Sequence, residues 1–110
     1  MKTPLTFLLA LTFLFLFSGS VYGGDLLDGL DAHKRKDYKE AFRLWKPLAE
    51  QGNASAQTNL GLMYEKGLGV PQDYKEEVKW HHLSAEQGNA FGQYNLGHMY
   101  EKGKGVPQDY

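Results

Sequence analysis

The sequence contains no cysteine in its 110 residues. This absence excludes a disulfide framework, a thiolate metal site, a cysteine nucleophile and a lipid-bearing cysteine at the amino terminus. A strong excess of charge of either sign is also missing, because 12 Lys and Arg face 13 Asp and Glu for a formal net charge of -1. So weak a field gives no default attraction to nucleic acid or to an acidic membrane, and we expect no nucleic-acid partner. The length allows one domain.

The amino terminus differs in composition from the rest of the chain. Lys2 precedes the apolar run from Leu5 to Phe17, and small or turn-forming residues continue to Gly24. This pattern is typical of a secretory signal peptide. Two pairs of residues fit the positions that signal peptidase reads: Ser18 with Ser20, and Val21 with Gly23. We favour cleavage after Gly23, which makes residues 1–23 the signal peptide.

The alternative is an uncleaved membrane anchor. The apolar run is shorter than the roughly 20 residues that span a bilayer, so we expect no stable membrane span after cleavage. Cleavage removes Lys2 alone among the charged residues and leaves 11 basic against 13 acidic residues. The expected product is a mildly acidic domain of residues 24–110 that is periplasmic or secreted by a bacterial type of export.

One long stretch of sequence occurs twice. The copies begin at Ala49 and Ala85, 36 residues apart, and end at Tyr74 and Tyr110. Five aligned pairs differ between them: Ser55 with Phe91, Ala56 with Gly92, Thr58 with Tyr94, Leu62 with His98, and Leu68 with Lys104. A fixed period of this length is the signature of stacked helix pairs. The predicted fold is therefore all-α, an α–α superhelix with a 36-residue period.

Each repeat carries the same signals for helix ends. The segment DYKE begins at Asp37 and again at Asp73, and an acidic cap with Glu three residues later predicts a capping box in which each side chain satisfies the other's free backbone amide. Glycine then ends the helix and asparagine caps the next one at two places: Gly52 with Asn53, and Gly88 with Asn89. Further helices are expected over residues 53–66 and 89–102. Pro47 lies inside the first DYKE helix and predicts a kink near residues 43–47.

Apolar residues recur at helical spacing in several of these segments. Leu26, Leu27, Leu30 and Ala32 lie close to helical spacing in a short first helix that ends in a basic cluster. In the helix after Asn53 the buried stripe holds four residues: Ala56, Leu60, Met63 and Tyr64. Gly61 and Gly97 each cost about 1 kcal/mol of helix propensity against alanine. We expect them where a neighbouring helix comes so close that a side chain would hold the backbones apart.

The repeat resembles the Sel-1-like repeat, a relative of the tetratricopeptide repeat. The first set of matching residues is Leu60, Gly61, Tyr64, Gly67, Gly69, Val70, Asp73, Lys75, Trp80, Ala85 and Gly88. The second set is Leu96, Gly97, Tyr100, Gly103, Gly105, Val106 and Asp109. The segment from Gly29 to Gly52 looks like the start of such arrays. The resemblance implies a right-handed superhelix of paired helices that acts as an adaptor or scaffold and takes no cofactor.

Two features depart from that pattern. Glu77 stands where the family usually has a small apolar residue, and Ala41 is the residue at that place in the preceding helix, so tight packing around Glu77 is in doubt. The sequence also stops at Tyr110, two residues into another DYKE segment. Because a repeat buries its apolar face only against a neighbour, three residues should be left partly exposed: Leu96, Met99 and Tyr100. We favour a fragment of a longer reading frame. The alternative is a protomer that self-associates through this uncapped repeat.

Three of the five differences between the copies indicate a recognition surface. At about 100° per residue, Ser55, Thr58 and Leu62 lie opposite the buried stripe, with Glu65 beside them. In related tetratricopeptide repeats this helix lines the concave groove that takes peptides. The predicted partner-binding residues are Ser55, Thr58, Leu62, Glu65, Phe91, Tyr94, His98 and Glu101. The alternatives are drift of an unconstrained surface, or packing of Phe91 and Tyr94 on a further repeat. The expected partner is a protein or peptide.

Catalytic signals are weak. His81 and His82 are adjacent and point about 100° apart on a helix, so they do not form the i, i+4 pair of zinc enzymes. Glu76 and Glu77 diverge in the same way, and no apolar cleft is evident that would shift a pKa. We expect no catalytic residue, metal or cofactor. The competing hypothesis is an envelope hydrolase or cell-wall modifying accessory, such as a β-lactamase-like repeat protein. Its support is weakened because cysteine and an S-x-x-K motif are both missing.

Overall fold

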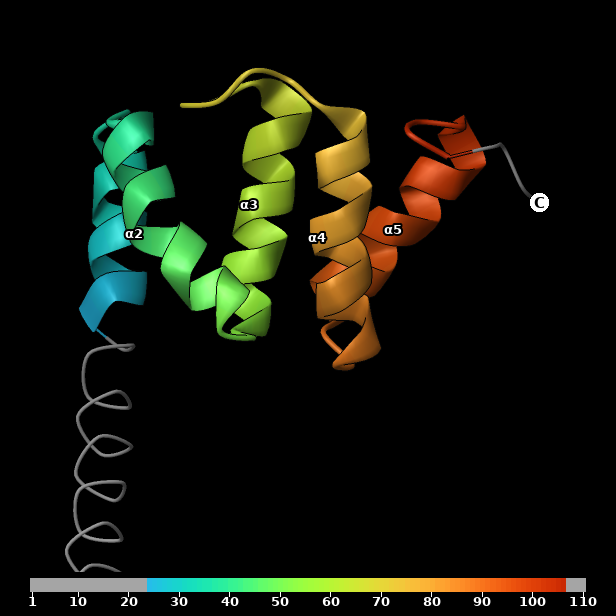
Figure 1. The fold of residues 1–110 in the computed structure, drawn as a ribbon, viewed down its shortest axis with the longest axis horizontal. Coiled ribbons are helices and arrows are strands. Elements are labelled where there is room, and N and C mark those ends of the chain that lie inside the picture. The colour runs from blue at the N-terminus through green and yellow to red at the C-terminus, as the bar shows by residue number, and fades with distance from the viewer. Residues whose placement is uncertain (1–23, 107–110) are drawn as a thin grey trace, which may run out of the picture.

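The computed structural model describes residues 24–106, which form five helices and no strand. A short helix spans residues 24–34. Four helices follow: α2 (Tyr38–Glu50), α3 (Ala54–Lys66), α4 (Tyr74–Glu86) and α5 (Ala90–Lys102). Figure 1 shows them side by side in chain order along one row. The all-α solenoid prediction is confirmed. The proposed signal peptide, residues 1–23, lies outside the described residues.

The helices alternate between two roles. We call the helix over residues 24–34, α3 and α5 the A helices, and α2 and α4 the B helices. Each B helix lies between two A helices in the row, and α4 packs on both α3 and α5. One side-chain hydrogen bond repeats with the period: the Gln57 amide donates to the Ala49 carbonyl over 3.1 Å, and the Gln93 amide donates to the Ala85 carbonyl over 3.4 Å.

The helix ends agree in most respects with the sequence signals. Asp37 and Asp73 cap α2 and α4, and each side chain accepts a backbone N–H from the first turn. The reciprocal half of the capping box was predicted wrongly. The Asp37 amide donates to the Ala32 carbonyl (2.8 Å), and the Asp73 amide donates to the Tyr64 carbonyl (3.0 Å). Carbonyl groups of the preceding A helices already satisfy these donors, so the glutamate side chains turn elsewhere.

The glutamates of the two DYKE segments bind side chains on their own helices. Glu40 pairs with Arg43, and Glu76 accepts from the Trp80 indole N–H (3.2 Å). The predicted turns into the A helices are confirmed: Gly52 and Gly88 have φ of 100° and 84°, which favours glycine. The side chains of Asn53 and Asn89 accept the backbone N–H groups of residues 56 and 92.

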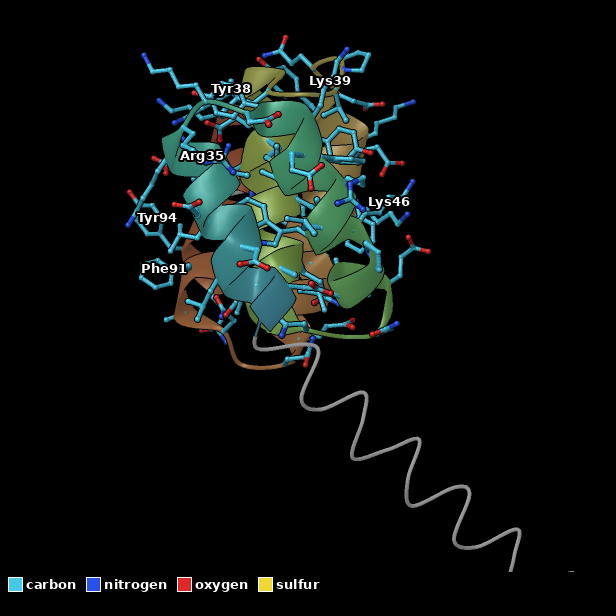
Figure 2. All side chains as sticks on the ribbon, turned by 90° about the vertical axis from the view of Figure 1, so that its left-hand side faces the viewer. Arg35, Tyr38, Lys39, Lys46, Phe91 and Tyr94 are labelled. Atoms are coloured by element: carbon cyan, nitrogen blue, oxygen red, sulfur yellow. The ribbon has the colours of Figure 1, made fainter. Side chains whose placement is uncertain are left out.

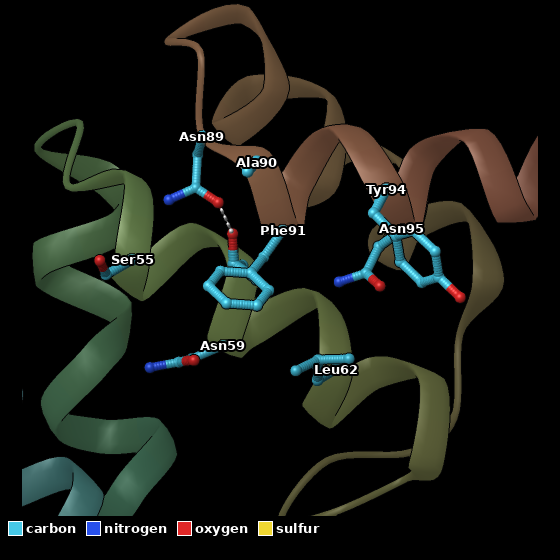
Figure 3. Close-up of a pocket in the computed structure, with 9 residues that line it drawn as sticks. Ser55, Asn59, Leu62, Asn89, Ala90, Phe91, Tyr94 and Asn95 are labelled. Carbon is cyan, nitrogen blue, oxygen red and sulfur yellow. Dashed lines mark hydrogen bonds between the residues drawn. The ribbon is translucent and has the colours of Figure 1, made fainter.

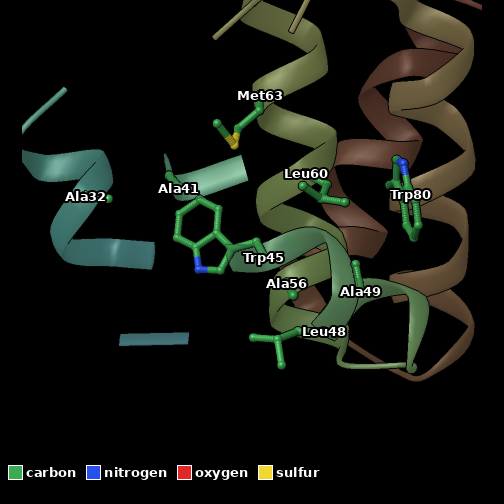
Figure 4. Close-up of a cluster of buried hydrophobic side chains, with 9 residues drawn as sticks. All are labelled: Ala32, Ala41, Trp45, Leu48, Ala49, Ala56, Leu60, Met63 and Trp80. Atoms are coloured by element: carbon green, nitrogen blue, oxygen red, sulfur yellow. The ribbon is translucent and has the colours of Figure 1, made fainter. Parts of the chain in front are cut away.

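The core lies where α2, α3 and α4 meet (Figure 4). Its buried residues are Ala32, Ala41, Trp45, Leu48, Ala49, Ala56, Leu60, Met63 and Trp80. Two of these core residues are aromatic and lie on the B helices: Trp45 on α2 and Trp80 on α4. The helix α2 continues through Pro47 without interruption, and in Figure 1 its second half turns toward α3. That turn agrees with a bend at the proline.

Burial differs from the simplest expectation at three apolar residues, and for Met99 it contradicts the prediction. Leu27 and Leu30 are 66% and 43% exposed, because the helix over residues 24–34 buries Gly29 and Ala32 instead. Met99 is only 1% exposed, since α5 packs on α4, whereas Tyr100 is 37% exposed and Leu96 is half-buried, as expected.

The two repeat glycines differ in their surroundings. A Cβ at Gly61 would lie 2.3 Å from Cε1 of the His81 ring, so the close neighbour is a buried side chain and not a backbone. A Cβ at Gly97 meets no heavy atom within 4 Å in the described part of the chain. The expected close approach of a neighbouring helix is thus met at Gly61, through the His81 ring of α4, whereas no element among residues 24–106 makes such an approach at Gly97.

This contrast yields a paired prediction. Gly61→Ala should lower the free energy of unfolding by about 1–2 kcal/mol, because the cost of overpacking against His81 exceeds the gain in helix propensity. Gly97→Ala has the same gain without the clash and should raise the free energy of unfolding by about 0.5–1 kcal/mol. Urea denaturation followed by far-UV circular dichroism measures both. Equal shifts in the two variants would contradict the His81 contact.

Candidate functional site: a groove between the A helices

A hollow of about 770 Å³ lies between α3 and α5. We call it the α3–α5 groove. Nine residues line it: Ser55, Thr58, Asn59, Leu62, Asn89, Ala90, Phe91, Tyr94 and Asn95. Figure 3 shows them projecting from the two helices around one opening. None carries a formal charge, so the groove presents apolar, amide and hydroxyl groups only.

Exposed aromatic side chains form one wall of the groove. Phe91 and Tyr94 are each 74% exposed. The Tyr94 ring stacks on His98, with centroids 6.5 Å apart and planes 6° apart, because residues four apart lie on one helix face. In Figure 2 both aromatics project from the side of the molecule opposite Lys46 of the B helix α2. Neighbouring exposed apolar side chains of this size mark interaction surfaces more often than isolated ones do.

Two asparagines, one from each A helix, place unused amides at the groove. Asn59 and Asn95 occupy the same repeat position and are both half-buried. Neither side chain has a hydrogen-bond partner among residues 24–106. An amide offers two donors and one acceptor oxygen. The groove can therefore bind polar main-chain groups at two points along its length.

Thr58 was expected on the outward face, but the structure buries it to 6% exposure. Its Oγ1 lies 2.7 Å from Oγ of Ser84 in a hydrogen bond and donates to Oδ1 of Asn89 over 3.3 Å. Ser84 in turn donates to the Ala54 carbonyl (3.1 Å). Thr58 thus ties the floor of the groove to α4. The helical wheel failed here because it ignores the capping residue of the next A helix, which lies against Thr58.

The other predicted partner-binding residues divide into two groups. Ser55 is exposed and Leu62 is half-buried, and both line the groove together with Phe91 and Tyr94. Three do not line it: Glu65, His98 and Glu101. His98 touches the groove only through its stack on Tyr94, and Glu101 is exposed. Glu65 lies on the α4 side of α3, where its charge acts on Glu77 and His81.

The exposed leucines of the helix over residues 24–34 continue the same side of the row. The segment between this helix and Asp37 has two residues, whereas the segment between α3 and Asp73 has six. Because of this difference of four residues, the helix over residues 24–34 aligns with α3 at an offset of 32 and not 36. The alignment pairs Gly29 with Gly61. A Cβ at Gly29 would lie 2.1 Å from the Trp45 ring, as one at Gly61 would meet the His81 ring. Leu27 and Leu30 then occupy the positions of Asn59 and Leu62.

A buried ionisable pair behind α3 was missed by the sequence analysis. Glu77 and His81 are 1% and 0% exposed, and Oε2 of the acid lies 3.6 Å from Nε2 of the ring. Burial, helped by the carboxylate of Glu65, raises the pKa of Glu77 to about 8. Burial lowers the pKa of His81 to about 4. We doubted tight packing around Glu77 and expected no shifted pKa there. Both expectations were wrong, because the Glu77 side chain is buried where α4 packs against its neighbours.

The pair is separate from the groove and offers no reaction site of its own. Both side chains are inaccessible to solvent. Within the described residues no group of three or more His, Cys, Asp or Glu side chains is arranged to hold a metal ion. In the groove itself, the lining residues offer hydrogen bonding and apolar contact.

The Sel1 repeat family model matches residues 22–53, 54–89 and 90–110, which together cover most of the chain. The chain belongs to the Sel1 repeat family. The second matched segment holds α3 and α4, so one Sel1 unit is an A helix followed by a B helix. Sel1 repeats generally serve as scaffolds for protein–protein interaction. No curated protein matches the sequence.

Solved Sel1-type structures have the same fold. A Sel1 repeat protein from Oxalobacter formigenes is 38% identical with a TM-score of 0.72, over 76% of this chain and 35% of that one. The protein c5321, described as a protective antigen present in uropathogenic Escherichia coli strains and displaying an SLR fold, is 39% identical with a TM-score of 0.78, over 81% of this chain and 20% of that one. This chain thus spans about a third and a fifth of their lengths.

The Thr58 network predicts a local stability effect at the groove floor. Thr58→Val keeps the shape and removes a buried hydroxyl that bonds Ser84 and Asn89, which should lower the free energy of unfolding by about 1–2 kcal/mol. Ser55→Ala, one turn away and exposed, should change it by less than about 0.5 kcal/mol. Urea denaturation of both variants beside the wild type measures the difference. A Thr58→Val variant as stable as Ser55→Ala would show that the network holds no part of α4 in place.

Proposed function

We propose that this Sel1 repeat chain is an exported scaffold or adaptor module that binds a protein or peptide segment in the α3–α5 groove. The observation that carries the proposal is the composition of the groove wall: two largely exposed aromatic side chains next to two amides that have no hydrogen-bond partner among residues 24–106. At such surfaces a few aromatic side chains often account for most of the binding energy. Amide side chains supply hydrogen bonds to a peptide main chain.

The shape of the groove supports a segment in extended conformation. Asn59 and Asn95 stand one repeat apart, so they can contact main-chain groups at two separated points of one strand-like peptide. Leu62 and Phe91 then flank an apolar side chain between those points. Because no lining residue is charged, an uncharged segment loses less hydration on binding than a charged one. The exposed Leu27 and Leu30 extend the same side of the row.

Export is part of the proposal and depends on residues 1–23. The lysine, apolar run and small residues there support a cleaved signal peptide and a periplasmic or secreted module. Within residues 24–106, no helix has both the length and the apolar character needed to cross a bilayer. Fractionation of cells that produce the tagged chain, with amino-terminal sequencing of the product, tests export. A cytoplasmic product that retains Met1 would contradict it.

Removal of the aromatic side chains should weaken partner capture. The triple variant Phe91→Ala, Tyr94→Ala, His98→Ala should retain the helicity of the wild type and lose at least about tenfold in affinity for proteins captured from an envelope extract, equivalent to about 1.4 kcal/mol. Immobilised wild type and variant are compared by quantitative mass spectrometry of the bound proteins, and the best candidate is then titrated by calorimetry.

A matched control comes from the B helix α4. His82 is an exposed histidine that does not line the groove, and its side chain pairs with Glu86. His82→Ala should therefore capture the same proteins as the wild type. Unchanged capture by the triple variant, or equal loss in the His82→Ala control, would reject the groove as the binding surface.

A further inference from the structure

Three apolar residues of the first repeat are replaced together by ionisable ones in the second. At the offset of 36, Ala41 aligns with Glu77, Trp45 with His81, and Leu68 with Lys104. Ala41 and Trp45 are core residues at 0% and 2% exposure, and Leu68 packs against that core. The replacements fall in one place, where a B helix meets the preceding A helix and the loop that follows the next A helix.

The second repeat buries these replacements as deeply as the first buries its apolar residues. The His81 ring lies against Gly61, and Glu77 sits one turn earlier on α4. Within the part of the chain that the structure describes, three buried atoms have no hydrogen-bond partner: Oε1 of Glu77 and both ring nitrogens of His81. The 3.6 Å between Oε2 and Nε2 is too long for a hydrogen bond. A buried polar pair left this incompletely satisfied is stable only while it carries no charge.

The neighbouring elements supply one charged group each. Glu65 faces the pair from α3. Burial raises the pKa of Glu77, and a side-chain hydrogen bond with Glu65 and the Glu65 charge raise it further. The same charge raises the pKa of His81 and there opposes the effect of burial. Lys104 acts from the loop after α5, where its Nζ lies 5.4 Å from the centre of the Tyr74 ring, and it opposes the upward shift of the Glu77 pKa. Gly105 holds this loop against α4, since a Cβ there would lie 2.6 Å from the Tyr74 carbonyl.

We propose that Glu77 and His81 form a pH-sensitive joint that holds α4 against α3 while both side chains are uncharged and loosens this contact when Glu77 ionises in mildly alkaline solution. The joint is independent of what the groove binds. It would nevertheless act on the groove, because Thr58 of the groove floor is bonded to Ser84 on the same helix as the pair.

The pH range follows from the two pKa values. Burial raises the pKa of Glu77 from an ordinary 4.5 to about 8, so its stabilising effect is complete below about 4.5 and is lost as the pH rises through 8. Burial lowers the pKa of His81 from 6.5 to about 4, so its effect is complete above about 6.5 and is lost as the pH falls through 4. Between about pH 4.5 and 6.5 the two groups change the stability in opposite directions as the pH rises. Above about pH 6.5 only the ionisation of Glu77 changes it.

Urea unfolding of the purified chain at pH 6.5, 7.5 and 9.0 tests the joint. The wild-type midpoint should fall by about 1 M across this range. Glu77→Gln keeps the shape without an ionisable proton, so its midpoint should stay nearly constant and exceed that of the wild type at pH 9.0. Glu50→Gln, at an exposed position of α2, should follow the wild type. A wild-type midpoint that does not fall, or a parallel fall in Glu77→Gln, would overturn the proposal.

Two further measurements keep the test decisive if Glu77→Gln folds poorly. The triple variant Glu77→Ala, His81→Trp, Lys104→Leu restores the residues of the preceding repeat and should unfold at a midpoint independent of pH above 6.5. Carbon-13 NMR of glutamate carboxyls in the wild type should show one group, assigned to Glu77 by its loss in Glu77→Asp, that titrates near pH 8. Titration of that group below about pH 5.5 would show that the pair is not held neutral, and would reject the joint whatever the variants do.

Discussion

The contact on which the array depends is an aromatic ring seated on a glycine of the preceding A helix. Trp45 lies on Gly29 and His81 on Gly61, at distances where no Cβ fits. The ring replaces the side chain that the glycine lacks, and this sets both the spacing and the register of consecutive helices, since interaxial distance depends on the residues at the contact. The Trp45 indole also donates to the Leu26 carbonyl (3.1 Å), which fixes the rotation of the helix over residues 24–34.

The position of that contact determines where the groove lies. Gly61 turns one side of α3 toward α4, so the residues on the other side, Ser55 and Leu62 among them, are left facing solvent and the next A helix. The same relation holds on α5, where Met99 is buried and Phe91 is exposed. Stacking therefore uses one stripe of each A helix and leaves the other for binding. Most residues that are identical in the two copies lie on the stripe used for stacking. Most of those that differ lie on the stripe left for binding.

The sequence predicted those features that depend on local chemistry. Asp37, Asn53 and Gly52 fix helix ends through contacts within a few residues, and the 36-residue period carries the same rules to the second copy. Prediction from the sequence failed where burial depends on contacts with elements distant in the sequence. The burial of Thr58 depends on Ser84 and Asn89 of other elements, and a helical wheel holds no information on them. Glu77 and His81 could have been found, because they are four residues apart and align with two positions suited to a core.

The two joints of the array differ in kind, and this has a consequence for how the molecule can respond. In a linear stack each repeat contacts only its neighbours, so the interfaces contribute to stability almost separately. The joint at Trp45 places an indole ring, which does not ionise, on Gly29, whereas the joint at His81 contains an acid and an imidazole that must stay neutral. Trp80 and Leu60 still bury apolar surface beside that second joint, which offsets the cost of its unpartnered atoms. Ionisation of Glu77 can thus loosen α4 and α5 while the apolar contact of α2 with Gly29 persists.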